Sequence, residues 1–161
     1  APPHLQAQWD EEYRMYFDFN ARVFGSGSIH KALQFKEEKF HDEEFLIIVD
    51  EAHKYRNEDT DDYILLHRLC QGNKVMLLTA TPFNNRPQDV FAMIKLFQIP
   101  SKSTIRSVDN LSYHFTEAIK EYKDINQKRA KKTIGEKEIQ RRVHELARKI
   151  RIILEPVVIR R

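Results

Sequence analysis

Two adjacent carboxylates follow a run of apolar residues in the first half of the chain. Asp50 and Glu51 come directly after residues 45–49, and His53 stands two positions further on. Successive side chains of an extended segment point in opposite directions, so the two carboxylates can do different work. One can hold a Mg²⁺ ion, which prefers hard oxygen ligands, while the other orients an attacking water. This pair therefore suits phosphoryl transfer, which depends on positioning and charge neutralisation.

A pair of threonines stands at the end of a second apolar run. Residues 74–78 lead into Thr79, Ala80 and Thr81, and Pro82 then stops further strand pairing. If both runs are neighbouring parallel strands, their ends meet at the sheet edge where ligands bind in open α/β sheets. Hydroxyls at that edge can hydrogen-bond His53 and the carboxylates. Each motif alone is typical of an ordinary turn after a strand, but the two together at this spacing indicate a nucleotide site.

The elements that must position these residues follow an α/β pattern. Strands are predicted at residues 45–49 and 74–78, and more weakly at 21–24; continuous hydrophobicity predicts that both faces of the sheet are covered. Helical spacing at residues 5–17, 29–39 and 62–70 alternates with them, and residues 71–73 read as the stop of the third helix. The alternation predicts a parallel sheet flanked by helices.

Beyond residue 100 the strand patterns stop. Apolar residues recur at helical spacing between 115 and 125 and between 139 and 154, which predicts an antiparallel helical protrusion. Thr133 and Glu136 have the spacing of a capping box at the start of the second helix. From Glu117 to Arg151, twelve Lys/Arg stand against six Asp/Glu, a net charge of +6, and the remainder of the chain carries −3. Such an extension can contact a phosphate backbone, although a solvated helix surface gives the same pattern.

Composition and spacing argue against several other classes of protein. No apolar run approaches the roughly 18 residues that span a bilayer, and the first residues do not form a signal peptide. We therefore expect a protein without a membrane partner that is cytoplasmic (bacterial type) or otherwise intracellular. Cys70 is the single cysteine and is expected to be a buried small side chain. The histidines lack the spacing of a zinc site, and no serine lies in a nucleophile-elbow setting.

The motifs resemble those of a known family. Residues 50–53 and 79–82 resemble motifs II and III of the superfamily 2 helicases, and the strings IIVDEAHKYRN and LLTATPFNN resemble the Swi/Snf-like branch. Residues 2–12 resemble motif Ia, and residues 25–28 sit where motif Ib would lie. The helical pair after residue 110 resembles the protrusion of this branch, and residues 154–161 resemble the end of its first lobe. The resemblance covers nearly the whole chain.

The resemblance implies a fold, an activity and a set of site residues. Residues 1–100 would be a partial RecA-like lobe of the P-loop NTPase type, residues 101–155 the protrusion, and residues 156–161 the start of the connection to a second lobe. The activity would be ATP-driven translocation on duplex DNA with ATP and Mg²⁺ as cofactors. Asp50 would bind Mg²⁺, Glu51 would activate water, and His53 would couple to Thr79, Ala80 and Thr81. DNA would lie near Gln8, Trp9, Gly25, Ser26, Gly27 and Ser28, and Arg160 and Arg161 would face the second lobe.

One departure from the family limits what this chain is expected to do alone. No G-x-x-x-x-G-K-[ST] loop occurs in the 161 residues. We therefore expect a truncated lobe that holds no cofactor and hydrolyses no ATP by itself, and whose open strand edge at residues 74–78 invites self-association. Two alternatives stay open: the lobe of an RNA helicase or restriction-type translocase, and a non-catalytic nucleic-acid or protein interaction module on a motor scaffold.

Overall fold

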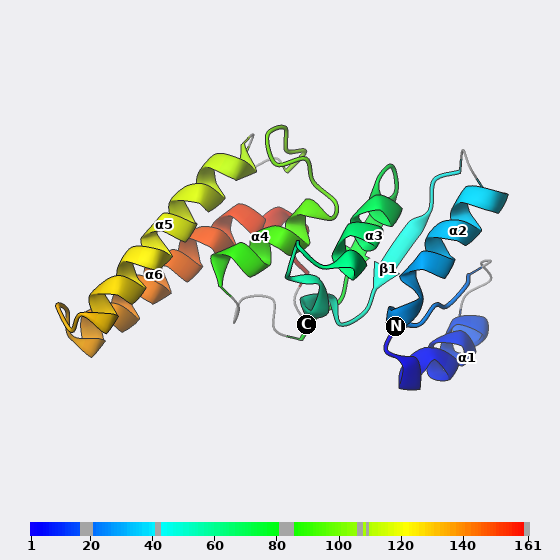
Figure 1. The fold of residues 1–161 in the computed structure, drawn as a ribbon, viewed down its shortest axis with the longest axis horizontal. Helices are drawn as coiled ribbons and strands as arrows, with labels where there is room; N and C mark the ends of the chain where they lie inside the picture. Colours follow the sequence, from blue (N-terminus) through cyan, green and yellow to red (C-terminus); the bar gives the residue numbers. More distant parts are fainter. Residues whose placement is uncertain (17–20, 41–42, 81–85, 106–107, 109, 160–161) are drawn as a thin grey trace. The chain divides into compact units, whose positions relative to one another are not determined.

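Two compact units make up the chain, Ala1–Ala80 and Thr81–Arg161. The computed structural model describes residues 1–16, 21–40, 43–80, 86–105, 108 and 110–159 (Figure 1). The sheet lies in the first unit, and the described elements of the second unit are all helical. No helix in these described ranges is long and apolar enough to cross a membrane.

The first unit is built around two parallel strands, β1 (Leu46–Val49) and β2 (Lys74–Leu77), in a register that pairs Leu46 with Lys74. This pairing confirms the predicted parallel α/β arrangement. The helical elements of the unit, in chain order, are η1 (Pro3–Leu5), α1 (Gln6–Tyr16), η2 (Ser26–Ser28), α2 (Ile29–Lys39), η3 (Ala52–Tyr55) and α3 (Asp61–Cys70).

The two faces of the sheet differ in exposure. On one face, Val49 is buried and its neighbours Ile47, Val75 and Leu77 are partly buried. On the other face, the apolar side chains Leu46, Ile48 and Met76 are 57%, 42% and 44% exposed. The expectation of a sheet covered on both faces is therefore met on one face only. A continuous apolar run shows that a strand can be buried on both faces, but it does not identify the residues that cover each face. The described residues leave the second face uncovered.

Helix α3 has the limits that its sequence predicts to within one residue. Thr60 caps its first turn by accepting a hydrogen bond from the Tyr63 amide at 3.3 Å. After Cys70 the chain turns at Gly72, whose φ of +70° lies in the left-handed region that glycine adopts without penalty. Cys70 is 2% exposed, as expected for a small buried side chain, and burial raises the pKa of its thiol to about 12.

The predicted weak strand at residues 21–24 is wrong. Residues 21–24 have no regular secondary structure, and they form no ladder with β1 or β2. Their described backbone partner is the chain start, where the Ala1 amine donates to the Phe24 carbonyl and the Ser26 amide donates to the Ala1 carbonyl. A strand requires a sustained ladder of such bonds, and this contact is a single step.

The second unit contains α4 (Pro87–Lys95), α5 (Leu111–Ala130), α6 (Glu136–Leu154) and η4 (Glu155–Val157). Helices α5 and α6 lie side by side as an antiparallel hairpin, which confirms the predicted helical pair (Figure 1). Their apolar stripes share one core, in which Phe115 and Ile125 are each 1% exposed and Phe91 of α4 stacks on Phe115 at 4.7 Å between ring centroids.

Helix α4 was not foreseen from the sequence. It packs on α5, while the predicted limits of residues 1–100, 101–155 and 156–161 stay a prediction.

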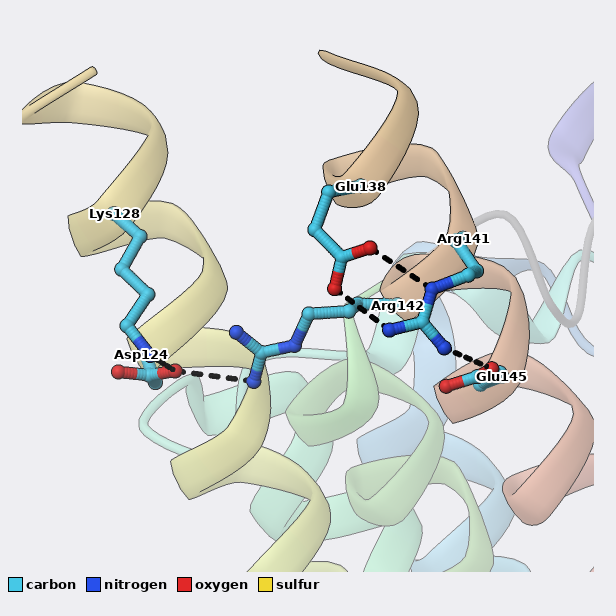
Figure 2. Close-up of polar contacts among 6 residues, drawn as sticks. All are labelled: Asp124, Lys128, Glu138, Arg141, Arg142 and Glu145. Carbon is cyan, nitrogen blue, oxygen red and sulfur yellow. Dashed lines mark hydrogen bonds and ion pairs between the residues drawn. The ribbon is translucent and has the colours of Figure 1, made fainter. Parts of the chain in front are cut away.

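Ion pairs line the outside of the hairpin. Asp124 of α5 accepts from Lys128 on its own helix at 2.9 Å and from Arg142 of α6 at 3.0 Å (Figure 2). Arg141 donates to Glu138 and Glu145, each at 2.7 Å. Asp124 therefore joins the two helices electrostatically, and the hydrogen bonds from Lys128 and Arg142 hold the pKa of its carboxyl below the ordinary value.

The predicted capping box at the start of α6 is also wrong. The N-cap is Gly135, which has no side chain to accept a bond. The Thr133 hydroxyl instead donates to the Lys128 carbonyl at 3.2 Å, so it closes the end of α5. The spacing from Thr133 to Glu136 fits either role, and the left-handed Lys132 before it decides between them.

Candidate functional site

The ends of β1 and β2 are tied together by their backbones. The Leu78 amide donates to the Val49 carbonyl at 2.8 Å, and the Ala52 amide donates to the Leu78 carbonyl at 2.9 Å. These bonds continue the ladder past both strands and hold the turn at Asp50 beside the segment that carries Thr79. The predicted juxtaposition of the acidic pair with the first threonine is therefore present at the carboxyl edge of the sheet.

Asp50 is held by two donors from different parts of the chain. Its Oδ2 accepts a hydrogen bond from the Trp9 indole Nε1 at 3.0 Å, and its Oδ1 accepts from the Glu51 amide at 2.9 Å. Both contacts fix the orientation of the carboxylate. Since each carboxylate oxygen has two lone pairs, each keeps one for a cation or for a water bound to a cation.

Glu51 occupies a strained backbone position. Its φ of 51° and ψ of 46° place it in the left-handed region, which costs an ordinary residue about 1–2 kcal/mol. Such outliers persist where the surroundings fix them, and they cluster at functional sites. The bend turns its side chain back, so that Oε2 lies 3.1 Å from the His53 Nδ1. The Glu51 side chain is 38% exposed, which leaves it accessible to solvent.

His53 links the acidic turn to the neighbouring strand end. Its Nδ1 lies 3.1 Å from Glu51 Oε2 and 3.5 Å from Thr79 Oγ1. One ring nitrogen thus serves both contacts, as a donor to the carboxylate in one tautomer and as an acceptor from the hydroxyl in the other. The threonine contact is at the long limit of a hydrogen bond, so it is the weaker of the two. Ala80 follows Thr79 and is exposed, and Thr81 lies outside the described residues.

The donor set fits magnesium better than a metal held entirely by protein. Among the residues that the structure describes, no three His, Cys, Asp or Glu side chains gather into a metal cluster. Mg²⁺ usually binds one or two carboxylates together with waters and substrate phosphates. Asp50, with two spare lone pairs at a sheet edge, fits that mode.

The residues predicted to contact nucleic acid lie on α1 and before α2. Gln8 is exposed on α1, whereas the adjacent Trp9 is partly buried and uses its N–H for Asp50. Gly25 is buried against the Gln6 side chain, which would lie 3.2 Å from an added Cβ, so no larger residue fits without displacing Gln6. Ser26, Gly27 and Ser28 form the single turn η2 that leads into α2. Arg160 and Arg161, predicted to face a second lobe, lie outside the described residues.

The bond between Trp9 and Asp50 is the main feature of the site that sequence reasoning missed. The two residues are 41 positions apart, and no periodicity links a helix to a turn at that distance. No local sequence pattern predicts that a tryptophan will bond a carboxylate at the end of a distant strand. Only the packing of α1 beside the sheet edge brings them together.

Comparison with known proteins agrees with this geometry. Residues 27–161 match the SNF2-related domain family. A stretch of 53 residues, 33% of this chain, is 40% identical to the uncharacterized ATP-dependent helicase YqhH of Bacillus subtilis (strain 168). That stretch spans 9% of the relative's length. No solved structure matches the chain significantly. Because the family match covers most of the sequence and includes the paired strand ends, the chain belongs to the SNF2-related domain family.

Proposed function

We propose that this chain forms part of the first motor lobe of an ATP-driven translocase on duplex DNA, with Asp50 and Glu51 at its hydrolytic centre. The observation that carries the proposal is the acidic turn, in which two carboxylates at the carboxyl edge of the sheet are fixed by different neighbours. The family match and the named helicase relative support the motor assignment.

In the proposed mechanism each residue of the turn has one task. Asp50, oriented by Trp9 and by the Glu51 amide, would hold Mg²⁺ directly or through water. When bound, Mg²⁺ supplies neutralisation of the charge on the phosphates during transfer. Glu51 would accept a hydrogen bond from the attacking water and orient it toward the γ-phosphate. Its partial exposure gives a water access to Oε1 and Oε2.

We assign the coupling of nucleotide state to movement to His53 and Thr79. A change at Glu51 alters the shared contact at His53 Nδ1, because the carboxylate and the hydroxyl both use that nitrogen. Thr79 would pass the change to the segment after β2, which includes Thr81. Gln8 and residues 25–28 would contact the DNA backbone, and small hydroxyls and amides are suited to phosphates since they read no bases.

The test is the substitution Glu51→Gln in the intact protein that contains this chain and a phosphate-binding loop. General-base catalysis contributes about 10²–10⁴-fold, so we expect DNA-stimulated ATP turnover to fall by at least about 100-fold while ATP binding is retained. Glutamine keeps the size and the backbone conformation of Glu51 but cannot accept a proton.

Glu43→Gln is the matched control. Glu43 is exposed before β1 and makes no contact with the turn in the described residues, so turnover should stay at the level of the unmodified protein. If Glu51→Gln retains full turnover, the hydrolytic role proposed for the acidic turn is wrong.

A further inference from the structure

The tip of the hairpin concentrates positive charge. Between Lys128 and Lys137 the chain has five Lys/Arg and a single carboxylate, Glu136, which gives a local net charge of +4. This stretch spans the end of α5, the connection and the first turn of α6. The tip is defined here as residues 128–137.

The shaft of the hairpin is defined as residues 111–127 and 138–154. Most described cations on the shaft are paired with a carboxylate, whereas several at the tip are not. On the shaft, Lys120 pairs with Glu117 and Lys149 pairs with Glu121, at 2.9 and 3.0 Å. The shaft cations Lys123 and Arg148 also lack a carboxylate partner among the described residues. At the tip, Lys128 and Arg129 have partners in Asp124 and Glu136, and three neighbouring lysines have none in the described part of the chain: Lys131, Lys132 and Lys137.

Helix stability does not account for two of these three lysines. Cations near the C-terminus of a helix interact favourably with its dipole, which explains Lys131 at the end of α5. Lys137, however, lies in the first turn of α6, where a positive charge is unfavourable. Lys132 has a φ of 53°, in the left-handed position that closes a helix and that glycine usually fills.

The backbone around Lys132 fixes that position. The Thr133 amide donates to the Lys128 carbonyl at 3.0 Å, and the Lys132 amide donates to the Arg129 carbonyl at 3.1 Å. These two bonds form a Schellman motif. A lysine at this position costs backbone free energy that glycine would not cost. The fold therefore gives no reason for a lysine at position 132, whereas an external anionic partner does.

The chemistry of the tip fits a phosphate polymer better than a protein. Protein interfaces depend on buried aromatic, apolar or arginine anchors. At the tip, Ile134 packs against the core of the unit, and Arg129 is paired with Glu136. The exposed residues include no aromatic or large apolar side chain: Arg129, Ala130, Lys131, Lys132, Thr133, Gly135, Glu136 and Lys137. We infer that Lys131, Lys132 and Lys137 contact the phosphate backbone of duplex DNA. This inference rests on the proposed action on duplex DNA and adds a contact at the far end of the hairpin.

The experiment measures binding of the 161-residue chain to a short fluorescent DNA duplex at a series of salt concentrations. The tip variant combines Lys131→Gln, Lys132→Asn and Lys137→Gln, and asparagine is chosen because it tolerates the left-handed backbone. Each lost phosphate contact lowers the slope of log affinity against log salt by about 0.9, so the slope should fall by about 2.7. Far-UV circular dichroism checks that the hairpin keeps its helical content.

A shaft variant removes the same number of charges elsewhere on the hairpin: Lys120→Gln, Arg141→Gln and Lys149→Gln. The inference predicts that its salt slope stays near that of the unmodified chain. It is overturned if the shaft variant loses as much slope as the tip variant, if the tip variant loses none, or if the chain binds no duplex at low salt. Competition by polyglutamate as effective as competition by unlabelled duplex would also overturn it, in favour of an acidic protein partner.

The binding assay involves no ATP turnover, so its result is independent of the Glu51→Gln test. If the salt slope is the same with and without the tip lysines, the proposed tip contact is wrong, and the proposed hydrolytic centre is unaffected. If Glu51→Gln retains full turnover but the salt slope depends on the tip lysines, the hydrolytic role is wrong and the tip contact stands.

Discussion

At the scale of single residues, Asn73 joins the end of α3 to the start of β1. Its Oδ1 accepts from the Phe45 amide at 2.9 Å, and its Nδ2 donates to the Leu69 carbonyl at 2.7 Å. One side chain therefore satisfies a donor before one strand and an acceptor of the last helical turn. These contacts fix where β1 begins, and so they fix the position of the acidic turn four residues later.

We expect Asn73→Ala to lower the free energy of unfolding by about 1–3 kcal/mol, because it leaves the Phe45 amide and the Leu69 carbonyl without their partner. Urea denaturation followed by circular dichroism measures the change. Asn73→Asp keeps the acceptor for Phe45 and loses only the donors, so its effect should be smaller. Equal losses in the two variants would show that the Phe45 bond contributes nothing.

The sequence predicted which residues of the site lie together, but it did not predict how they are held. Asp50, Glu51, His53 and Thr79 follow two apolar runs, and parallel pairing of those runs is enough to bring them to one edge. The left-handed backbone of Glu51 was not predictable, since glutamate rarely adopts it and no glycine marks the position. The roles of these residues stay predictions until turnover is measured.

At the scale of elements, predictions succeeded for long apolar spacing and for the two apolar runs that pair as β1 and β2, and failed where a short pattern had two readings. Helices α5 and α6 show that spacing over 20 and 19 residues. The short run at residues 21–24 has the composition of a strand but lacks a partner ladder. Helix α4 could have been found from Pro87 at its start, Asp89 in its first turn and the apolar face of Val90, Phe91 and Ile94.

The stability of the hairpin should depend on pH through the ionisation of the Asp124 carboxyl. The pKa of its carboxyl is lowered by hydrogen bonds from Lys128 and then Arg142, so the folded state binds its proton less readily than the unfolded chain. The stabilisation is therefore fully present above the ordinary pKa of about 3.9 and is lost as the pH falls through the lowered folded value. Acid should therefore destabilise the hairpin.

Melting temperatures of the chain and of Asp124→Asn, measured from neutral pH into acid, test this assignment. We expect the variant to melt lower at neutral pH, with a difference that persists to about pH 3.9 and then closes. Glu117→Gln, which removes one exposed pair within α5, should show a smaller difference throughout. A difference that closes well above pH 4 would assign the stabilisation to another group.

At the scale of the whole molecule, the two units carry opposite charge. Residues 1–80 have nine Lys/Arg against fifteen Asp/Glu, a net charge of −6, and residues 81–161 have eighteen against nine, a net charge of +9. The modest total of +3 therefore conceals a strong asymmetry. A polyanion is therefore attracted to the second unit and repelled by the first.

In the described residues β2 pairs with β1 alone, and its outer edge gives a prediction about assembly. The Lys74 and Leu78 amides donate to β1, so alternation along the strand leaves the Val75 amide facing away from it. We expect concentration-dependent self-association in sedimentation velocity, and we expect Val75→Pro to reduce it by removing an outward donor without breaking a bond to β1. Met76→Pro, which should break pairing with β1, is the destabilising comparison. A chain that stays monomeric at all concentrations contradicts the prediction.

The bond between Trp9 and Asp50 gives the chain an optical property. Trp9 is its single tryptophan, and its indole N–H rests on the carboxylate proposed to hold the metal. The ultraviolet emission of an indole depends on the groups around it, so all tryptophan light from this chain originates beside the acidic turn. The protein thus contains an intrinsic fluorescent probe. The intensity and wavelength of its emission should change when a ligand binds or displaces that carboxylate.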